Sequence, residues 1–86
     1  MKRIVETAEE SGLVSLLGEN VLLMCSDYFY TGKLVGVNDT FVELENTSIV
    51  YETGAWDEPG YGDAQRMHAD KWSVQLSHIE SWGLGK

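Results

Sequence analysis

Two histidines and a run of acidic residues are the side chains of this chain best suited to metal chemistry. His68 lies near Asp63 and Asp70, residue types that zinc accepts, but their spacing matches no established zinc pattern. Asp57, Glu58 and Asp63 offer the oxygen ligands that calcium prefers, yet they lack the ordered spacing of an EF-hand loop. The sequence therefore predicts a solvated acidic stretch, without a metal or any other cofactor.

The sequence also lacks the common catalytic motifs. It contains no nucleophile elbow, no glycine-rich phosphate loop and no carboxylate pair spaced for shared proton chemistry. Glu43 and Glu45 share one face of an expected strand and are interpreted as ordinary surface charge. Tyr28, Phe29 and Tyr30 could form a platform for stacking bases, but alternation along a strand favours the core for at least one of them. We expect no enzymatic activity.

Length and charge narrow the classes of function. The whole chain, residues 1–86, has the length of one domain, and a domain this small is marginally stable alone. With one cysteine it cannot form an internal disulfide, so oligomerisation is the expected source of extra stability. The net charge of −8 counts against general nucleic-acid binding, which depends on lysine and arginine. No signal peptide or membrane-spanning run is recognised, which favours a cytoplasmic protein.

Hydrophobic patterning predicts a mostly β domain that positions these residues. A short helix is expected within residues 3–17, with Ser11 as a cap for a turn and Gly18 as the end. Strands are expected at 21–25, 29–37, 41–45, 49–51, 72–77 and 79–82. A polar kink at 46–48 leaves open whether 41–51 is one long bent strand or two. Residues 53–71, rich in glycine and acids, are expected to form a long exposed loop.

Two glycines lie inside the strand expected at 29–37. Gly32 and Gly36 would weaken a strand unless the chain bends sharply there or another backbone comes close. Strong bending in so short a chain predicts a small closed barrel of five antiparallel strands. The continuously apolar strand 21–25 should be covered on both faces, by the core on one side and by the helix or another subunit on the other.

In this order of elements the chain resembles the Sm-like (LSm) family, which includes the Sm proteins and bacterial Hfq. The matching residues are Leu17-Gly18, Val21, Leu23, Tyr30, Gly32, Leu34, Gly36, Val37-Asn38, Phe41, Leu44 and Asn46-Thr47. The match covers residues 13–52 well and 72–82 loosely, with the long loop inserted where family members vary. The resemblance implies a short N-terminal helix followed by a strongly bent barrel at about residues 19–82.

The resemblance further implies a homo-oligomeric ring of about five to seven subunits, in which the fourth strand of one copy pairs with the fifth strand of its neighbour. Pairing of this kind would satisfy the open edges of a small barrel. The residues expected at this interface are Trp72, Val74, Leu76, Ile79 and Trp82.

Sm proteins bind RNA in the ring pore through an Asp-x-apolar-Asn motif after the second strand and an Arg-Gly pair between the last two. The residues at these two positions here are Asn38, Asp39 and Phe41, and Gln75, Ser77 and His78. An aromatic ring with amide or imidazole groups can stack on and hydrogen-bond a base, so single-stranded RNA is one expected partner. His78 has a plainer interpretation as a polar turn or interface residue. The alternative function is a ring-forming module whose partner is a protein.

Overall fold

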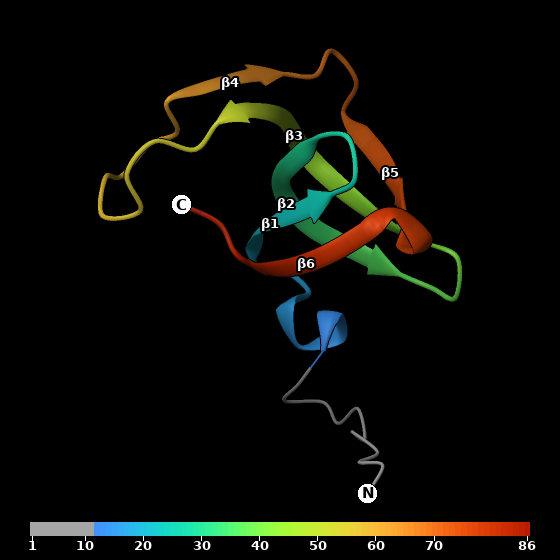
Figure 1. Cartoon of the computed structure of the whole chain (residues 1–86). Coiled ribbons are helices and arrows are strands. Elements are labelled where there is room, and N and C mark those ends of the chain that lie inside the picture. Colours follow the sequence, from blue (N-terminus) through green and yellow to red (C-terminus); the bar gives the residue numbers. More distant parts are fainter. Residues whose placement is uncertain (1–11) are drawn as a thin grey trace, which may run out of the picture.

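The computed structural model describes residues 12–86, which form one curved antiparallel sheet with two short 3-10 helices (Figure 1). The strands are β1 (Asn20–Cys25), β2 (Phe29–Val37), β3 (Phe41–Glu52), β4 (Asp63–Arg66), β5 (Lys71–Gln75) and β6 (Ile79–Leu84), and the helices are η1 (Leu13–Leu16) and η2 (Leu76–His78). The prediction of a mostly β, antiparallel fold is confirmed.

The sheet runs in the order β4-β3-β2-β1-β6, and β5 also pairs with β3. β3 is long enough to pair with β5 along its first half, Phe41–Glu45, and with β4 along its second half, Ser48–Glu52. The alternative left open by the sequence is thus settled in favour of one long strand. It is kinked at Asn46, whose φ of 52° lies in the left-handed region that asparagine tolerates.

Gly32 lies where the backbone of β3 comes close to β2. The register leaves Gly32 opposite both Asn46 and Thr47, which is a β-bulge that bends the pair. A Cβ atom at Gly32 would lie 2.8 Å from the carbonyl oxygen of Glu45 and 3.2 Å from the Cα of Thr47. The predicted close approach of another backbone is confirmed at this position.

One face of the sheet forms the core. Its fully buried members come from β1, β2 and β3, and the N-terminal Leu13 packs with them. The core residues are Leu13, Val21, Leu23, Cys25, Leu34, Val42, Leu44 and Val74. Val42 and Leu44 face inward while Glu43 and Glu45 are only partly covered, as the alternation of β3 predicts.

Three expectations differ from the structure. The sheet curls but does not close into a barrel, because η2 joins β5 to β6 without pairing them. The expected loop at 53–71 contains a strand, β4, whose four exposed residues carry no burial pattern that the sequence could reveal. Of the expected helix 3–17, the part up to Ser11 lies outside the described residues, and the described part is the four-residue 3-10 helix η1.

Gly18 ends the helical segment with a φ of 88°, as predicted for a glycine stop. Leu13 is buried and Leu16 packs against the core, whereas Leu17 is exposed. Among residues 12–86 there is no helix of sufficient length and apolar character to cross a membrane.

Candidate functional site

Two turns that are far apart in the sequence meet at one end of the molecule. The β2–β3 turn follows Val37, and the chain turns into η2 directly after Gln75 at the end of β5. Phe41 is the register partner of Gln75, and the amide of Leu76 donates to the carbonyl oxygen of Thr40 at 2.9 Å. The structure therefore brings the two predicted halves of the RNA site, at residues 38–41 and 75–78, side by side.

Asn38 builds the β2–β3 turn with its own side chain. Its Oδ1 accepts hydrogen bonds from the Thr40 amide at 2.8 Å, the Phe41 amide at 2.9 Å and the Thr40 hydroxyl at 3.1 Å. This is the local side chain-to-backbone capping for which asparagine is favoured in turns. The side-chain oxygen is therefore already engaged, and only the Asn38 amide NH₂ group can donate to a base edge.

The other predicted RNA-site residues differ in exposure. Phe41 is partly buried, while Asp39, Gln75 and Ser77 are exposed. These two turns, residues 38–41 and 75–78, include the carboxylate of Asp39 but no lysine or arginine. Phosphate attraction is therefore absent from these two turns, and any base recognition there depends on stacking and neutral hydrogen bonds.

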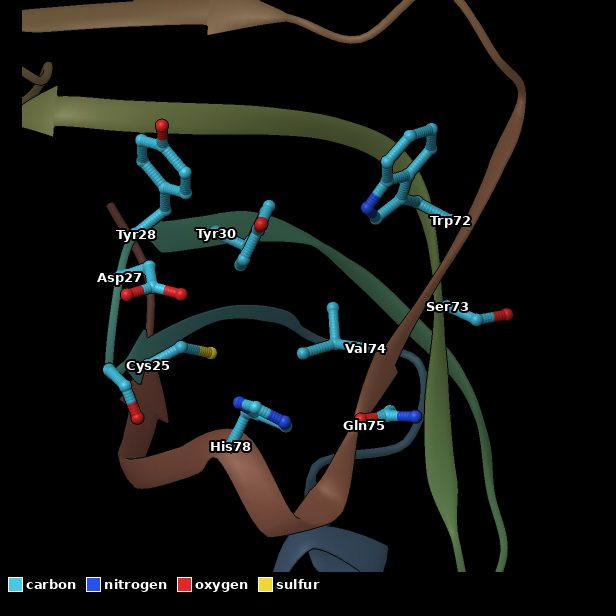
Figure 2. A pocket seen from close by; sticks show the side chains of 10 residues that line it. Cys25, Asp27, Tyr28, Tyr30, Trp72, Ser73, Val74, Gln75 and His78 are labelled. Atoms are coloured by element: carbon cyan, nitrogen blue, oxygen red, sulfur yellow. The ribbon is translucent and has the colours of Figure 1, made fainter.

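His78 faces a separate cavity, a pocket of about 260 Å³ between β5, η2 and the β1–β2 turn. Figure 2 shows Tyr28 and Tyr30 on one side of this pocket, Trp72 across from them and Val74 pointing inward. The sequence grouped His78 with the predicted RNA-site residues. The carbonyl oxygen of His78 also accepts a hydrogen bond from the Ser26 amide at 3.2 Å, which links η2 to the β1–β2 turn on the two sides of the pocket. Of the predicted set, only His78 and Gln75 line this pocket.

Two aromatic walls of the pocket, Tyr28 and Tyr30, come from the residues that the sequence assigned to a possible stacking platform. Tyr30 packs against the core, as the strand alternation predicts, whereas Tyr28 is exposed and meets Tyr51 edge-on, with ring centroids 6.3 Å apart.

Cys25 lines the same pocket. Burial raises the pKa of the Cys25 thiol, and the charge of Glu80 raises it further. The thiol is thus held in its neutral form, which is poorly nucleophilic.

The predicted interface residues lie mostly against the core of their own subunit. Val74 is only 6% exposed, and Trp72, Leu76 and Ile79 are partly buried and pack on the core. Trp82 is the exception, since 46% of it is exposed. In Trp72, Val74, Leu76 and Ile79 the backbone, more than the side chain, is therefore available for contact with another copy.

A second apolar surface was missed by the sequence reasoning. Leu22, Met24, Trp56, Trp82 and Leu84 line a groove of about 190 Å³ on the face of β1 and β6 that points away from the core. Leu84 is 66% exposed and Trp56 62% exposed, whereas Leu22 is buried. The apolar run of β1 predicted a covered outer face, and Trp82 was predicted as an interface residue. Within one copy the groove is completed by Trp56 and by β6 rather than by the expected helix, and the sequence did not predict the contribution of Trp56.

Two basic residues in the described part of the chain have partners away from these turns. Lys71 forms an exposed ion pair with Glu43 at 3.7 Å, and Arg66 donates to the side-chain oxygen of Asn46 at 2.8 Å. Within residues 12–86 no three metal-ligating side chains gather into one group, and His68 is exposed. Comparisons of the chain with protein-family models, with curated proteins and with solved structures found no match.

Proposed function

We propose that this protein is a self-assembling interaction module of the Sm-like type, which forms a closed homo-oligomeric ring by pairing the rim of β5 in one copy with the rim of β6 in the next. The observation that carries the proposal is the open sheet. In residues 12–86, β5 pairs only with β3 and β6 only with β1, so each has one edge without a partner strand.

Physical chemistry favours covering these edges. An unpaired strand edge exposes a row of backbone donors and acceptors that invites pairing with another chain. A head-to-tail contact between two different edges closes into a ring when the rotation between copies permits it. The resemblance to Sm-like proteins implies a bent second strand and a turn between the last two strands, and here the 3-10 helix η2 joins β5 to β6.

Side chains beside the two edges also suit such a contact. Trp82 and Leu84 project from β6 into solvent, and an apolar pocket walled by Tyr30 and Trp72 opens beside β5. Exposed aromatic and aliphatic side chains facing a pocket of this kind are typical of interface anchors. In the proposed ring, Trp82 and Leu84 of one copy therefore lie near the pocket beside β5 of the next copy.

The contact is tested by two substitutions of the same type. Leu84→Glu puts a charge beside the β6 edge, while Leu17→Glu puts one on an exposed leucine between η1 and β1. Both side chains are exposed, so both variants should fold. We expect Leu84→Glu to lower the oligomer mass measured by light scattering at a fixed concentration, and Leu17→Glu to leave it unchanged. Equal masses for both variants and the wild type would contradict the assigned edge.

Single-stranded RNA is the second candidate, and the meeting of the two turns at Phe41 and Gln75 favours it. Binding of short U-rich and A-rich RNAs would be measured by fluorescence polarisation at low and physiological salt. Stacking on Phe41 predicts that Phe41→Ala weakens binding about tenfold, since base–aromatic stacking contributes about 1–3 kcal/mol. His78→Ala should weaken binding as well, whereas Tyr51→Ala, at an exposed aromatic residue outside the two turns, should change affinity little. No binding at physiological salt, or binding unaffected by Phe41→Ala, leaves the protein-only module as the function.

A further inference from the structure

Lys86 inserts its side-chain ammonium into the loop that joins β3 to β4. The Nζ atom donates to the carbonyl oxygens of Thr53 at 2.6 Å, Ala55 at 2.8 Å and Gly60 at 2.9 Å. The same atom lies 5.5 Å from the ring centroid of Trp56 and 5.2 Å from that of Tyr61. Three carbonyl oxygens and two aromatic rings thus surround one cation.

This arrangement matches the chemistry of a primary ammonium group. A lysine ammonium has three donors, and here each donor has its own carbonyl acceptor. The two aromatic rings lie within the distance of about 6 Å at which a cation is attracted to a ring face. A trimethylated ammonium has no N–H donors and a neutral acetamide has no positive charge, so either would lose most of these interactions.

The chain holds Lys86 in place through its backbone as well. Its amide donates to the Tyr61 hydroxyl at 3.1 Å, and that hydroxyl donates to the Thr31 Oγ1 at 3.3 Å. The amide of Gly85 donates to the Asn20 carbonyl oxygen at 2.9 Å. A Cβ at Gly85 would lie 3.0 Å from Thr31 Oγ1, so the segment fits tightly between β1, β2 and Tyr61.

We propose that residues 53–61 form a binding site for a primary ammonium group, which Lys86 fills from within the same chain, and that neutralising or removing this ammonium vacates the site for another. The loop meets the sheet through this cation, through Trp56 in the groove beside β1 and β6, and through the Tyr61 hydroxyl. It contains Gly54 with a φ of 71° and the internal hydrogen bond from the Glu58 amide to the Ala55 carbonyl oxygen, at 3.1 Å. In this proposal, an ammonium group in the site holds Trp56 and the carbonyl oxygens around it in their present arrangement. This inference is independent of the proposed ring.

The test uses the whole chain with Lys86→Ala, followed by NMR of the backbone amides and of the Trp56 indole. We expect hydrogen exchange of the Glu58 amide to accelerate about tenfold, because the loss of one hydrogen bond to a charged group accounts for at least that factor. The Trp56 indole signal should shift while that of Trp72 stays in place. Lys33→Ala, which removes an exposed lysine of β2, should change neither.

Chemical rescue then tests the ligand class. Methylammonium chloride added to Lys86→Ala should restore the Trp56 signal in a saturable way, whereas tetramethylammonium chloride at the same concentration should not. Lys86→Met, which keeps a long unbranched side chain without the charge, should behave as Lys86→Ala does. Wild-type exchange at Glu58 in both variants would overturn the role of the ammonium. Equal responses to the two salts would overturn the assignment of a primary ammonium site.

Discussion

Gly32 provides the sharpest test of how this sheet is built. In the wild-type structure the space for a side chain at this position is already taken by the backbone of β3. A Cβ in Gly32→Ala would lie 2.8 Å from the Glu45 carbonyl oxygen and 3.2 Å from two atoms of Thr47. Because these neighbours are mainly backbone atoms of a paired strand, they can move only if β2 and β3 separate.

The size of the effect follows from this geometry. Relieving the overlap requires the two strands to part by several tenths of an ångström, and overpacking of this kind costs about 1–3 kcal/mol. Alanine lowers the entropy of the unfolded chain and offsets about 0.5–1 kcal/mol of that cost. We therefore expect the free energy of unfolding to fall by about 1–2 kcal/mol, which lowers Tm by about 4–16 °C in a domain of this size.

Gly36→Ala is the matched control in the same strand. A Cβ there would meet only the Cβ of Glu43, at 3.5 Å, which is an ordinary van der Waals contact. Its unfolding free energy should stay within about 1 kcal/mol of wild type, on the stabilising side. Thermal melts at one fixed protein concentration compare the two variants, since assembly makes Tm depend on concentration. Equal Tm values for Gly32→Ala and Gly36→Ala would refute the explanation of the bend by close backbone approach.

Three further substitutions or conditions give distinct expectations. The Thr47 hydroxyl is buried with no hydrogen-bond partner among the described residues, so Thr47→Val should raise the unfolding free energy by about 1 kcal/mol in chemical denaturation, and a loss would contradict this. Asn38→Ala removes the acceptor of three hydrogen bonds in the β2–β3 turn and should cost about 1 kcal/mol, while Asn38→Asp should retain most of the stability. The raised pKa of Cys25 means that the folded state holds the thiol proton more tightly than the unfolded state does. Its contribution to the free energy of unfolding is therefore complete below about pH 8.5 and is lost as the pH rises further. Cys25→Ala should flatten the pH dependence of the unfolding free energy above that pH.

Much of the sheet could be predicted because its signals are local. The strand predicted at 29–37 has the bounds of β2, and the alternation of Val42 and Leu44 with glutamates placed the inner face of β3. Gly32 and Gly36 were predicted, from residue type alone, to mark a sharp bend or a close approach of another backbone, and the close approach is found at Gly32 but not at Gly36. These features depend on periodicity and backbone freedom, which a sequence shows directly.

The features that could not be predicted depend on contacts between distant segments. β4 exists because β3 extends past Asn46 and offers an edge, and the four exposed residues of β4 carry no hydrophobic period. The contact of Lys86 with the 53–60 carbonyl oxygens joins positions 26–33 residues apart and involves backbone acceptors that every sequence possesses. Val74 was expected at a subunit interface because a β edge was expected there, and its side chain instead fills the core.

That last difference changes how assembly must be tested. A charge at Val74 would disrupt the core, so loss of assembly in such a variant would not distinguish an interface defect from unfolding. Exposed positions of β6, such as Trp82 and Leu84, separate these two effects.

We propose that β5 and β6, each with one edge unpaired among residues 12–86 of a single copy, pair between copies. Sedimentation equilibrium of the wild-type chain from low to high micromolar concentration measures this most directly. We expect one species with a mass of about five to seven times the 9.6 kDa of the chain, unchanged across this range. A folded species of 9.6 kDa at every concentration would contradict it.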